Sequence, residues 1–242
     1  MTIKIFIGTS PNGEDKEIEE IYEHTLRENS KENIEIHWMK LSNDKNSIWG
    51  GWNTTKWFTP FSGLRWAIPH ACNFEGKAIY TDVDMINFKD IKELFNLELK
   101  GKPFAARKGP RWGHELCVML IDCQLAKKYI WDIEKLKRRK DSHSFHRNLI
   151  ASNPMLIQEI DSRWNCLDGE DRKIEDIYQL HFTNMSSQPW SPIWYKGEKT
   201  PHSRKDIIEK YNELKSIINS KKKGGAEPVL DDKEIVDYEI LL

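Results

Sequence analysis

Residues 78–85 read AIYTDVDM, an apolar run that ends in two carboxylates, Asp82 and Asp84. We predict a buried β-strand here. Successive side chains of a strand point to opposite faces, so residues i and i+2 share a face about 6.5–7 Å apart. The two aspartates can therefore face one cleft. Their hard oxygen ligands suit Mg²⁺ or Mn²⁺, which usually also takes waters and phosphate oxygens, so the stretch predicts a metal site for a diphosphate.

The pair also has a structural alternative, because aspartate is common where a strand turns into a loop and bonds the nearby backbone. Asp90 fits that description better. It precedes a short helical segment, and Glu93 three residues later completes a capping-box pattern. We therefore assign Asp90 to a helix N-cap and keep Asp82 and Asp84 as candidate ligands.

The composition favours one soluble α/β domain. The chain has 242 residues, and 37 basic residues balance 38 acidic ones, which excludes the basic field of a nucleic-acid-binding protein. No apolar run is long enough for a transmembrane helix, and the first apolar segment, residues 3–7, is too short for a signal peptide. The four cysteines show neither zinc-site spacing nor a disulfide framework. We expect a cytoplasmic protein with reduced thiols.

Ten tryptophans is a high count for this length, and several lie in polar segments. Trp49, Trp52 and Trp57 fall in one such segment, and Trp190 and Trp194 in another. Core packing explains some of them. In loops rich in Gly, Asn and Thr, however, tryptophan more often offers an amphipathic face to a binding surface, and the apolar face of a sugar ring is a natural partner.

The first forty residues have the pattern of a β-α-β unit of the nucleotide-binding type. An apolar strand at residues 3–7 precedes a turn-rich loop, and helical spacing of apolar residues follows. Residues 33–41 then alternate as a second strand. The remaining elements that we expect are a long polar loop at 42–60, a helix at 61–68, strands at 104–106 and 116–121, a helix at 124–139, strands at 157–161 and 179–183, and a helix from Ser203. A linker-like break at 221–225 leads us to predict a domain at 1–219 and a charged tail at 220–242.

Four separated segments, taken in order, resemble one family. They are Phe61-Ser62-Gly63-Leu64-Arg65, Ile79–Asp84, Val118–Asp122, and Leu180-His181-Phe182 followed by Gln188-Pro189-Trp190; Ser162–Asn165 adds a weaker match. The pattern resembles the nucleotide-sugar-dependent glycosyltransferases of the GT-A fold, most closely the family 8 type of glycogenin and lipopolysaccharide galactosyltransferase. The resemblance covers about residues 1–195. It implies an α/β fold, a single Rossmann-like GT-A domain whose mixed central sheet is flanked by helices.

The resemblance also implies a ligand set for the metal. Asp82 would face the donor sugar and ribose, Asp84 would bind the metal directly, and His181 would be a further protein ligand. An imidazole beside two carboxylates suits Mn²⁺ better than Mg²⁺. The alternative for His181 by itself is a partly buried histidine held by hydrogen bonds.

Further site residues follow from the same resemblance. Asp82 and Arg65 would take part in catalysis, with the guanidinium fork of Arg65 holding the diphosphate or the sugar; its alternative is a surface salt bridge. Gly8, Thr9 and Ser10 follow the first strand, where the base and ribose would lie. Gln188 and Trp190 would belong to a loop that closes over the donor and excludes water.

The chain also departs from the family pattern. Gln188 stands where the family has a lysine that touches the diphosphate, and Lys196, or Arg107 with Lys108, would be the replacement. The usual Asn-x-Gly is replaced within residues 113–117, and an expected Asp-Gln-Asp is absent near 145–150. These differences leave the sugar and the stereochemistry open.

From these observations we expect a Mn²⁺- or Mg²⁺-dependent glycosyltransferase. It would move a hexose from a nucleotide sugar, a UDP-hexose in the first instance, to a carbohydrate or glycoconjugate acceptor with retention of configuration. Three alternatives remain: an inverting transferase that uses Glu115, Asp168 or Glu170 as base, a nucleotide-sugar hydrolase, and a non-catalytic sugar- or nucleotide-binding module.

Overall fold

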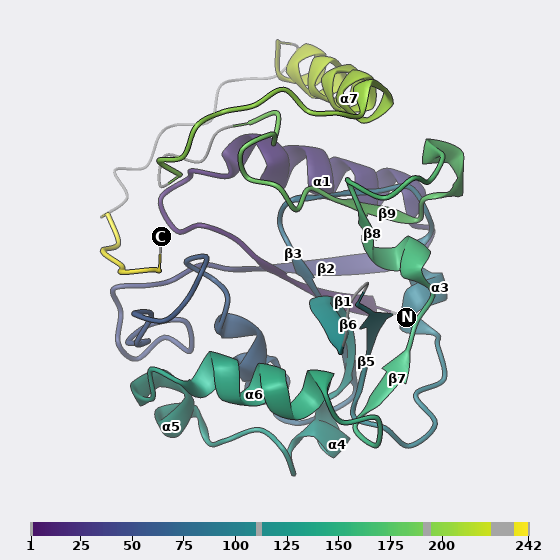
Figure 1. Cartoon of the computed structure of the whole chain (residues 1–242). Coiled ribbons are helices and arrows are strands. Elements are labelled where there is room, and N and C mark those ends of the chain that lie inside the picture. Colours follow the sequence, from purple (N-terminus) through teal and green to yellow (C-terminus); the bar gives the residue numbers. More distant parts are fainter. Residues whose placement is uncertain (1, 110–112, 191–194, 224–234, 242) are drawn as a thin grey trace.

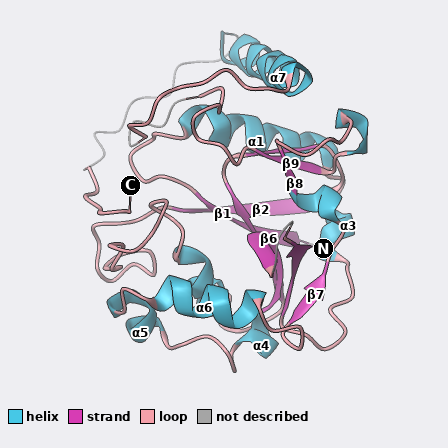
Figure 2. Ribbon diagram, viewed as in Figure 1, coloured by secondary structure: helices cyan, strands magenta, loops and turns pink. Residues whose placement is uncertain are grey.

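A six-stranded mixed sheet lies at the centre of the computed structural model, which describes residues 2–109, 113–190, 195–223 and 235–241. In chain order its strands are β1 (Thr2–Gly8), β2 (Asn33–Met39), β3 (Lys77–Asp82), β5 (Phe104–Lys108), β6 (His114–Asp122) and β7 (Ile157–Glu159). They lie in the spatial order β2-β1-β3-β6-β5-β7. Figure 2 distinguishes the strands from the helices around them. Strand β1 is parallel to β2 and β3, whereas β6 is antiparallel to β3 and β5. The predicted α/β fold with a mixed central sheet is confirmed.

A smaller sheet of three short strands continues from the end of β3. Its strands are β4 (Met85–Asn87), β8 (Cys166–Leu167) and β9 (Gln179–His181), in the spatial order β4-β9-β8. Strand β4 pairs antiparallel with β9, and Met85 lies opposite His181. The chain therefore crosses from one sheet to the other at Val83 and Asp84, which brings this aspartate next to the histidine strand.

Helices cover both faces of the central sheet (Figure 1). Helix α1 (Lys16–Asn29) and helix α7 (Lys205–Lys223) lie together on one side, and α4 (Cys123–Ala126), α5 (Ile133–Arg138) and α6 (Ser142–Ala151) lie on the other. The remaining short helices are α2 (Ile68–Ala71), α3 (Ile91–Phe95), and the 3₁₀ turns η1 (Leu64–Ala67), η2 (Ser162–Asn165) and η3 (Ile174–Asp176). Asp90 is the N-cap of α3, as predicted, and accepts a hydrogen bond from the Lys92 amide.

The helix expected at 124–139 is wrong in extent, because two aspartates start two separate short helices. Asp122 caps α4 by accepting from the Leu125 amide, and Asp132 caps α5 by accepting from the Lys135 amide. Residues 127–132 between them are not helical. The helix expected at 61–68 is a 3₁₀ turn, η1, that continues into α2, and α6 was not expected at all.

Residues 221–223 are also helical, although the lysine and glycine run led us to expect a linker there. Helix α7 is held against α1 by two ion pairs, from Lys215 to Glu17 at 2.7 Å and from Lys222 to Glu20 at 2.5 Å. Gly224 and Gly225 lie outside the described residues, as does Trp194. The division into a domain at 1–219 and a tail at 220–242 stays a prediction. Within the described part of the chain, no helix is long and apolar enough to cross a membrane.

Residues 235–241 lie along the loops that follow β1 and β2. Asn12 exchanges hydrogen bonds with the backbone of Val236, donating at 3.1 Å and accepting at 2.9 Å. The Leu241 amide donates to the Trp57 carbonyl at 2.6 Å. Trp57 itself is completely buried, so it is one of the tryptophans that core packing explains. It packs against Gly63, where an added Cβ would lie 2.2 Å from the indole Cζ2.

Candidate active site

Strand register alone brings the candidate residues together at one edge of the sheet. Gly8 of β1 lies opposite Asp82 of β3, and Thr81 lies opposite Val118, which places Cys117 next along β6 toward Asp82. The β4–β9 pairing adds His181 from the far end of the chain. A cavity of about 400 Å³ opens at this point. Its described lining is Asp15, Thr59, Phe61, Asp82, Val83, Asp84, Glu115, Cys117, Leu167, His181, Thr183, Met185, Gln188 and Trp190.

Arg65 is buried behind Asp82 and fixes the position of that carboxylate. Its Nη2 donates to Asp82 Oδ1 at 3.0 Å, its Nε donates to the Ser62 carbonyl at 2.9 Å, and its Nη1 donates to the Leu116 carbonyl. The Tyr80 hydroxyl also donates to Asp82 Oδ1. Arg65 is only 6% exposed, so the alternative of a surface salt bridge is wrong. Because Arg65 touches Asp82 and does not line the cavity, its contact with a diphosphate stays a prediction.

Asp84 and His181 face each other across the junction of the two sheets. His181 Nε2 lies 3.3 Å from Asp84 Oδ1, and His181 Nδ1 lies 2.9 Å from Asn165 Oδ1. The Asn165 amide holds the imidazole ring through Nδ1, which leaves Nε2 on the side of Asp84. Burial lowers the pKa of His181, but the charges of Asp84 and Asp82 outweigh it and raise the pKa overall. Burial raises the pKa of Asp84, with His181 opposing.

Asp84 also gives a test of whether a metal ion fits this place. Its Oδ1 is buried, and among the described residues it forms an ion pair with His181 Nε2 at 3.3 Å. A buried carboxylate needs a positive charge beside it, which either a protonated imidazole or a metal ion bound to both groups can supply. The arrangement of Asp84 Oδ1 beside His181 Nε2 therefore fits a divalent metal ion.

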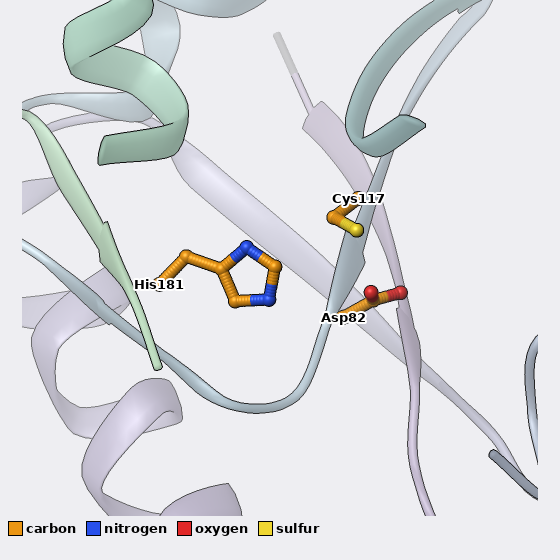
Figure 3. A group of neighbouring side chains, drawn as sticks. All are labelled: Asp82, Cys117 and His181. Atoms are coloured by element: carbon orange, nitrogen blue, oxygen red, sulfur yellow. The ribbon is translucent and has the colours of Figure 1, made fainter. Parts of the chain in front are cut away.

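Cys117 is a residue of the site that the sequence reasoning missed. In the described part of the chain, one group of three potential ligand side chains has all its ligand atoms within 4.8 Å of one another: Asp82, Cys117 and His181 (Figure 3). Burial, and then the charge of Asp82, raises the pKa of the Cys117 thiol well above its usual value, while Arg65 opposes this. The sequence carried no signal for this approach, because it depends on the register between β3 and β6.

Asp15 is a second residue that was not predicted. It accepts hydrogen bonds from the Ser10 amide at 3.1 Å and from the Ser10 hydroxyl at 2.5 Å, and it lines the cavity. Burial raises its pKa from 3.8 to about 6, although the bonds from Ser10 oppose this. The Thr9 hydroxyl instead donates to Glu19 at 2.6 Å. The predicted residues Gly8, Thr9 and Ser10 are thus not part of the described cavity lining. Asp15, which is bonded to Ser10, is the residue of this loop that lines the cavity.

Gln188 and Trp190 also line the cavity. The Gln188 amide donates to Asp84 Oδ2 at 3.3 Å and to the Phe182 carbonyl at 3.0 Å. The Trp190 indole stacks on Tyr211 of α7, with ring centroids 5.9 Å apart. Both residues line the cavity, and their part in a loop that closes over a donor stays a prediction.

Most of the other charged residues proposed from the sequence are already bonded to the protein, and Glu115 is the exception among those described below. Arg107 is buried, donating to Glu170 at 2.7 Å and to the Asn165 carbonyl at 2.7 Å. Asp168 is buried and accepts from the Thr183 hydroxyl at 2.6 Å. Arg107, Glu170 and Asp168 therefore have structural partners. Glu115 lines the cavity and makes no ion pair with any described residue, which leaves its carboxylate open to a ligand.

The fold is that of structurally characterised glycosyltransferases. The glycosyltransferase GlyE of Streptococcus pneumoniae TIGR4 matches with a TM-score of 0.59 and 15% identity, over 93% of this chain and 64% of that one. The bifunctional glycosyltransferase WbbM matches with a TM-score of 0.61 and 11% identity, over 90% and 51%. The galactosyltransferase LgtC, solved with donor and acceptor sugar analogues, matches with a TM-score of 0.58 and 11% identity, over 89% and 96%.

The chain spans about two thirds of the length of GlyE and half that of WbbM. No protein-family model matches the chain, and neither does any curated protein. At these identities the likeness establishes the GT-A type of fold, and function has to be argued from the site.

Proposed function

We propose that the protein is a metal-dependent glycosyltransferase that moves a hexose from a UDP-linked sugar to a carbohydrate or glycoconjugate acceptor. The observation that supports this most is the cavity at the end of β3. It combines Asp82, Asp84 and His181 within a fold shared with glycosyltransferases. Enclosed cavities with a few convergent polar groups are where ligands bind in such folds.

In this proposal Asp84 and His181 hold a Mn²⁺ or Mg²⁺ ion, and Asp82 faces the donor sugar. The ion would supply positive charge for the diphosphate leaving group. Arg65 keeps Asp82 in one orientation, since three of its nitrogens are already bonded to the protein. Trp190 and Gln188 cover the site and exclude water, which limits hydrolysis of the donor.

A cation is still needed near the diphosphate, because Gln188 is neutral. We propose Lys199 for this part. Its ammonium donates to the carbonyls of Met185 at 2.9 Å and Trp190 at 3.3 Å, and both of these residues line the cavity. Arg107 is excluded by its buried pairing with Glu170. A flexible lysine at the rim can swing onto phosphate oxygens when the donor binds.

Glu115 is the carboxylate that we assign to the acceptor side of the cavity. It would bind an acceptor hydroxyl, and with retention of configuration it would orient the nucleophile without forming a covalent bond. In an inverting enzyme the same carboxylate would act as the base. The anomeric configuration of the product, read by NMR spectroscopy, separates the two.

The proposal is tested by a panel of nucleotide sugars, with binding and release of the nucleoside diphosphate measured with and without a divalent metal. Asp84→Asn and His181→Ala should lose both activities. Asp176→Asn on η3 and His24→Ala on α1 are matched controls, because neither side chain lines the cavity, and both should behave like the parent. Variants at Asp84 and His181 that bind and turn over the donor normally would overturn the site. Fast release of free sugar without an acceptor would instead indicate a hydrolase.

A further inference from the structure

Cys117 brings a thiol into the cavity, although Mg²⁺ and Mn²⁺ prefer oxygen ligands. Strand β6 places its partly exposed side chain at the cavity wall, next to Asp82, and the His181 imidazole points toward both from β9 (Figure 3). The ligand atoms of these three residues lie within 4.8 Å of one another. A thiol in this position changes the chemistry of the ligand set.

The spacing of the ligand atoms suits a four-coordinate ion. Around a tetrahedral Zn²⁺ ion, nitrogen and oxygen ligands at 2.0–2.1 Å lie about 3.3 Å apart, and a sulfur and a nitrogen ligand lie about 3.6 Å apart. His181 Nε2 and Asp84 Oδ1 are already 3.3 Å apart. The ligand atoms of Cys117, Asp82 and His181 all lie within 4.8 Å of one another, so these side chains can close around an ion by small rotamer adjustments.

The surroundings prepare these ligands for a metal. Asn165 bonds His181 Nδ1 at 2.9 Å, and a histidine fixed in this way presents Nε2 to an ion. His181 Nε2 lies 3.3 Å from the buried Asp84 Oδ1. This buried carboxylate and the imidazole beside it are observations independent of the cysteine.

We propose that Cys117 is a ligand of the metal in this site, together with His181 and the Asp82 carboxylate, and that the site therefore prefers Zn²⁺ or Co²⁺ to Mn²⁺ and Mg²⁺. Thiolate ligands select these softer ions, whereas carboxylates alone do not. When the metal–sulfur bond forms, the thiol proton leaves to solvent, and no oxidant or reductant is needed. The inference rests on the proposed metal site, but its test does not require turnover.

The test uses Co²⁺ alone, added to the full-length protein without nucleotide. A thiolate bound to Co²⁺ gives a charge-transfer band in the near ultraviolet, which oxygen and nitrogen ligands do not give. We expect the band in the parent protein and in Cys72→Ala, a matched change at a buried cysteine outside the cavity lining. Cys117→Ser should lose it. A parent complex without the band would overturn the proposal.

Affinity for Zn²⁺, measured by competition with a chromophoric chelator, gives a second readout. Removal of a residue that only hydrogen-bonds to a metal ligand costs about 10–100-fold in metal affinity. Removal of the ligand itself should cost at least as much, so Cys117→Ser should weaken Zn²⁺ binding at least tenfold. Binding of Mn²⁺ should change much less. Equal Zn²⁺ affinity in parent and variant would contradict the assignment.

If Cys117→Ser does not fold, the parent protein still answers the question. Alkylation of Cys117 by iodoacetamide, followed by mass spectrometry of its peptide, should be slowed by Zn²⁺ and left unchanged by Mg²⁺; equal rates with both ions would overturn the proposal. A transferase that needs Asp84 and His181 but shows no thiolate band would keep the proposed function and lose this inference. A thiolate band in a protein that transfers no sugar would do the reverse.

Discussion

Asp82 is the residue at which η1, β3 and β6 meet. It accepts hydrogen bonds from Arg65 and Tyr80, and it lies beside Cys117. Both partners of the Arg65–Asp82 ion pair are buried, with 6% and 8% exposure. In this geometry Arg65 positions the Asp82 carboxylate. A buried arginine does this better than a lysine, because its planar guanidinium group donates to several acceptors at once.

Replacing Arg65 by methionine tests that role. Removal of one partner of a buried ion pair leaves an uncompensated charge, so Arg65→Met should lower the free energy of unfolding by about 3–5 kcal/mol. Urea denaturation measures this loss. The double variant Arg65→Met/Asp82→Asn should recover part of it, because the remaining charge is removed. A double variant that is less stable than Arg65→Met would contradict the pairing.

Asp15 predicts a dependence of stability on pH. Its pKa of about 6 in the folded protein lies above its ordinary value of 3.8. Between these values the folded state binds more protons than the unfolded state, so stability falls as pH rises through this window. Over the whole window the loss is about 3 kcal/mol. Asp15→Asn has no such ionisation, so its stability relative to the parent should increase by that order between about pH 4 and pH 7.

The measurement is urea denaturation of both proteins over this range of pH. The amide of asparagine retains an oxygen that can accept from Ser10, so the loop geometry should be kept. A variant whose stability follows that of the parent at every pH would show that burial of Asp15 costs nothing.

At the scale of elements, the contact between Gly63 and Trp57 holds the start of η1 in place. An added Cβ at Gly63 would approach the indole to 2.2 Å, and Trp57 is fully buried. Gly63→Ala should therefore cost about 1–3 kcal/mol of stability through overpacking. Gly169→Ala is the matched control, because nothing lies within 4 Å of a Cβ there. Equal stability of the two variants would contradict the packing argument.

The elements that were predicted correctly have a clear periodic pattern of apolar residues. Strands β1, β2, β3 and β6 are apolar or alternating runs, and α1 has an apolar stripe with acidic residues in its first turn. Helix α6 was missed because its Ser-, His- and Asn-containing sequence lacks such a stripe and its preceding Asp141 makes no side-chain cap. The break between α4 and α5 was missed because Asp132 acts as an N-cap inside an otherwise helical pattern.

The site could be predicted only where its residues belong to a sequence motif. Asp82, Asp84 and His181 belong to motifs in the sequence, and the structure brings them to one cavity. Cys117 and Asp15 carry no motif. One depends on antiparallel register between β3 and β6, and the other on a loop that folds back onto Ser10, and neither can be read from a single sequence.

At the scale of the whole molecule, residues 235–241 tie the end of the chain to the loops that hold the cavity. These contacts reach Asn12, Thr54 and Trp57. Most are exposed or half-buried, so each contributes little, and deletion of residues 224–242 should lower the free energy of unfolding by about 1–3 kcal/mol. Urea denaturation of the deleted and full chains checks this. No change in stability would mean that the segment does not hold the loops.

The same two loops supply Asp15 and Thr59 to the cavity, while α7 supplies the ring behind Trp190. The cavity is therefore built from segments that are far apart in the sequence, and its integrity depends on the complete fold. On the proposed function, this cavity binds a nucleoside diphosphate through a divalent metal held by Asp84 and His181.

The most direct test of that claim is calorimetric titration of UDP into the parent protein and Asp84→Asn, each with Mn²⁺, Zn²⁺ or a chelator. We expect the parent to bind UDP only when a metal is present, and Asp84→Asn to bind it at least a hundredfold more weakly, which corresponds to about 2.7 kcal/mol. UDP that binds the parent equally well in chelator, or binds Asp84→Asn as tightly as the parent, would contradict it.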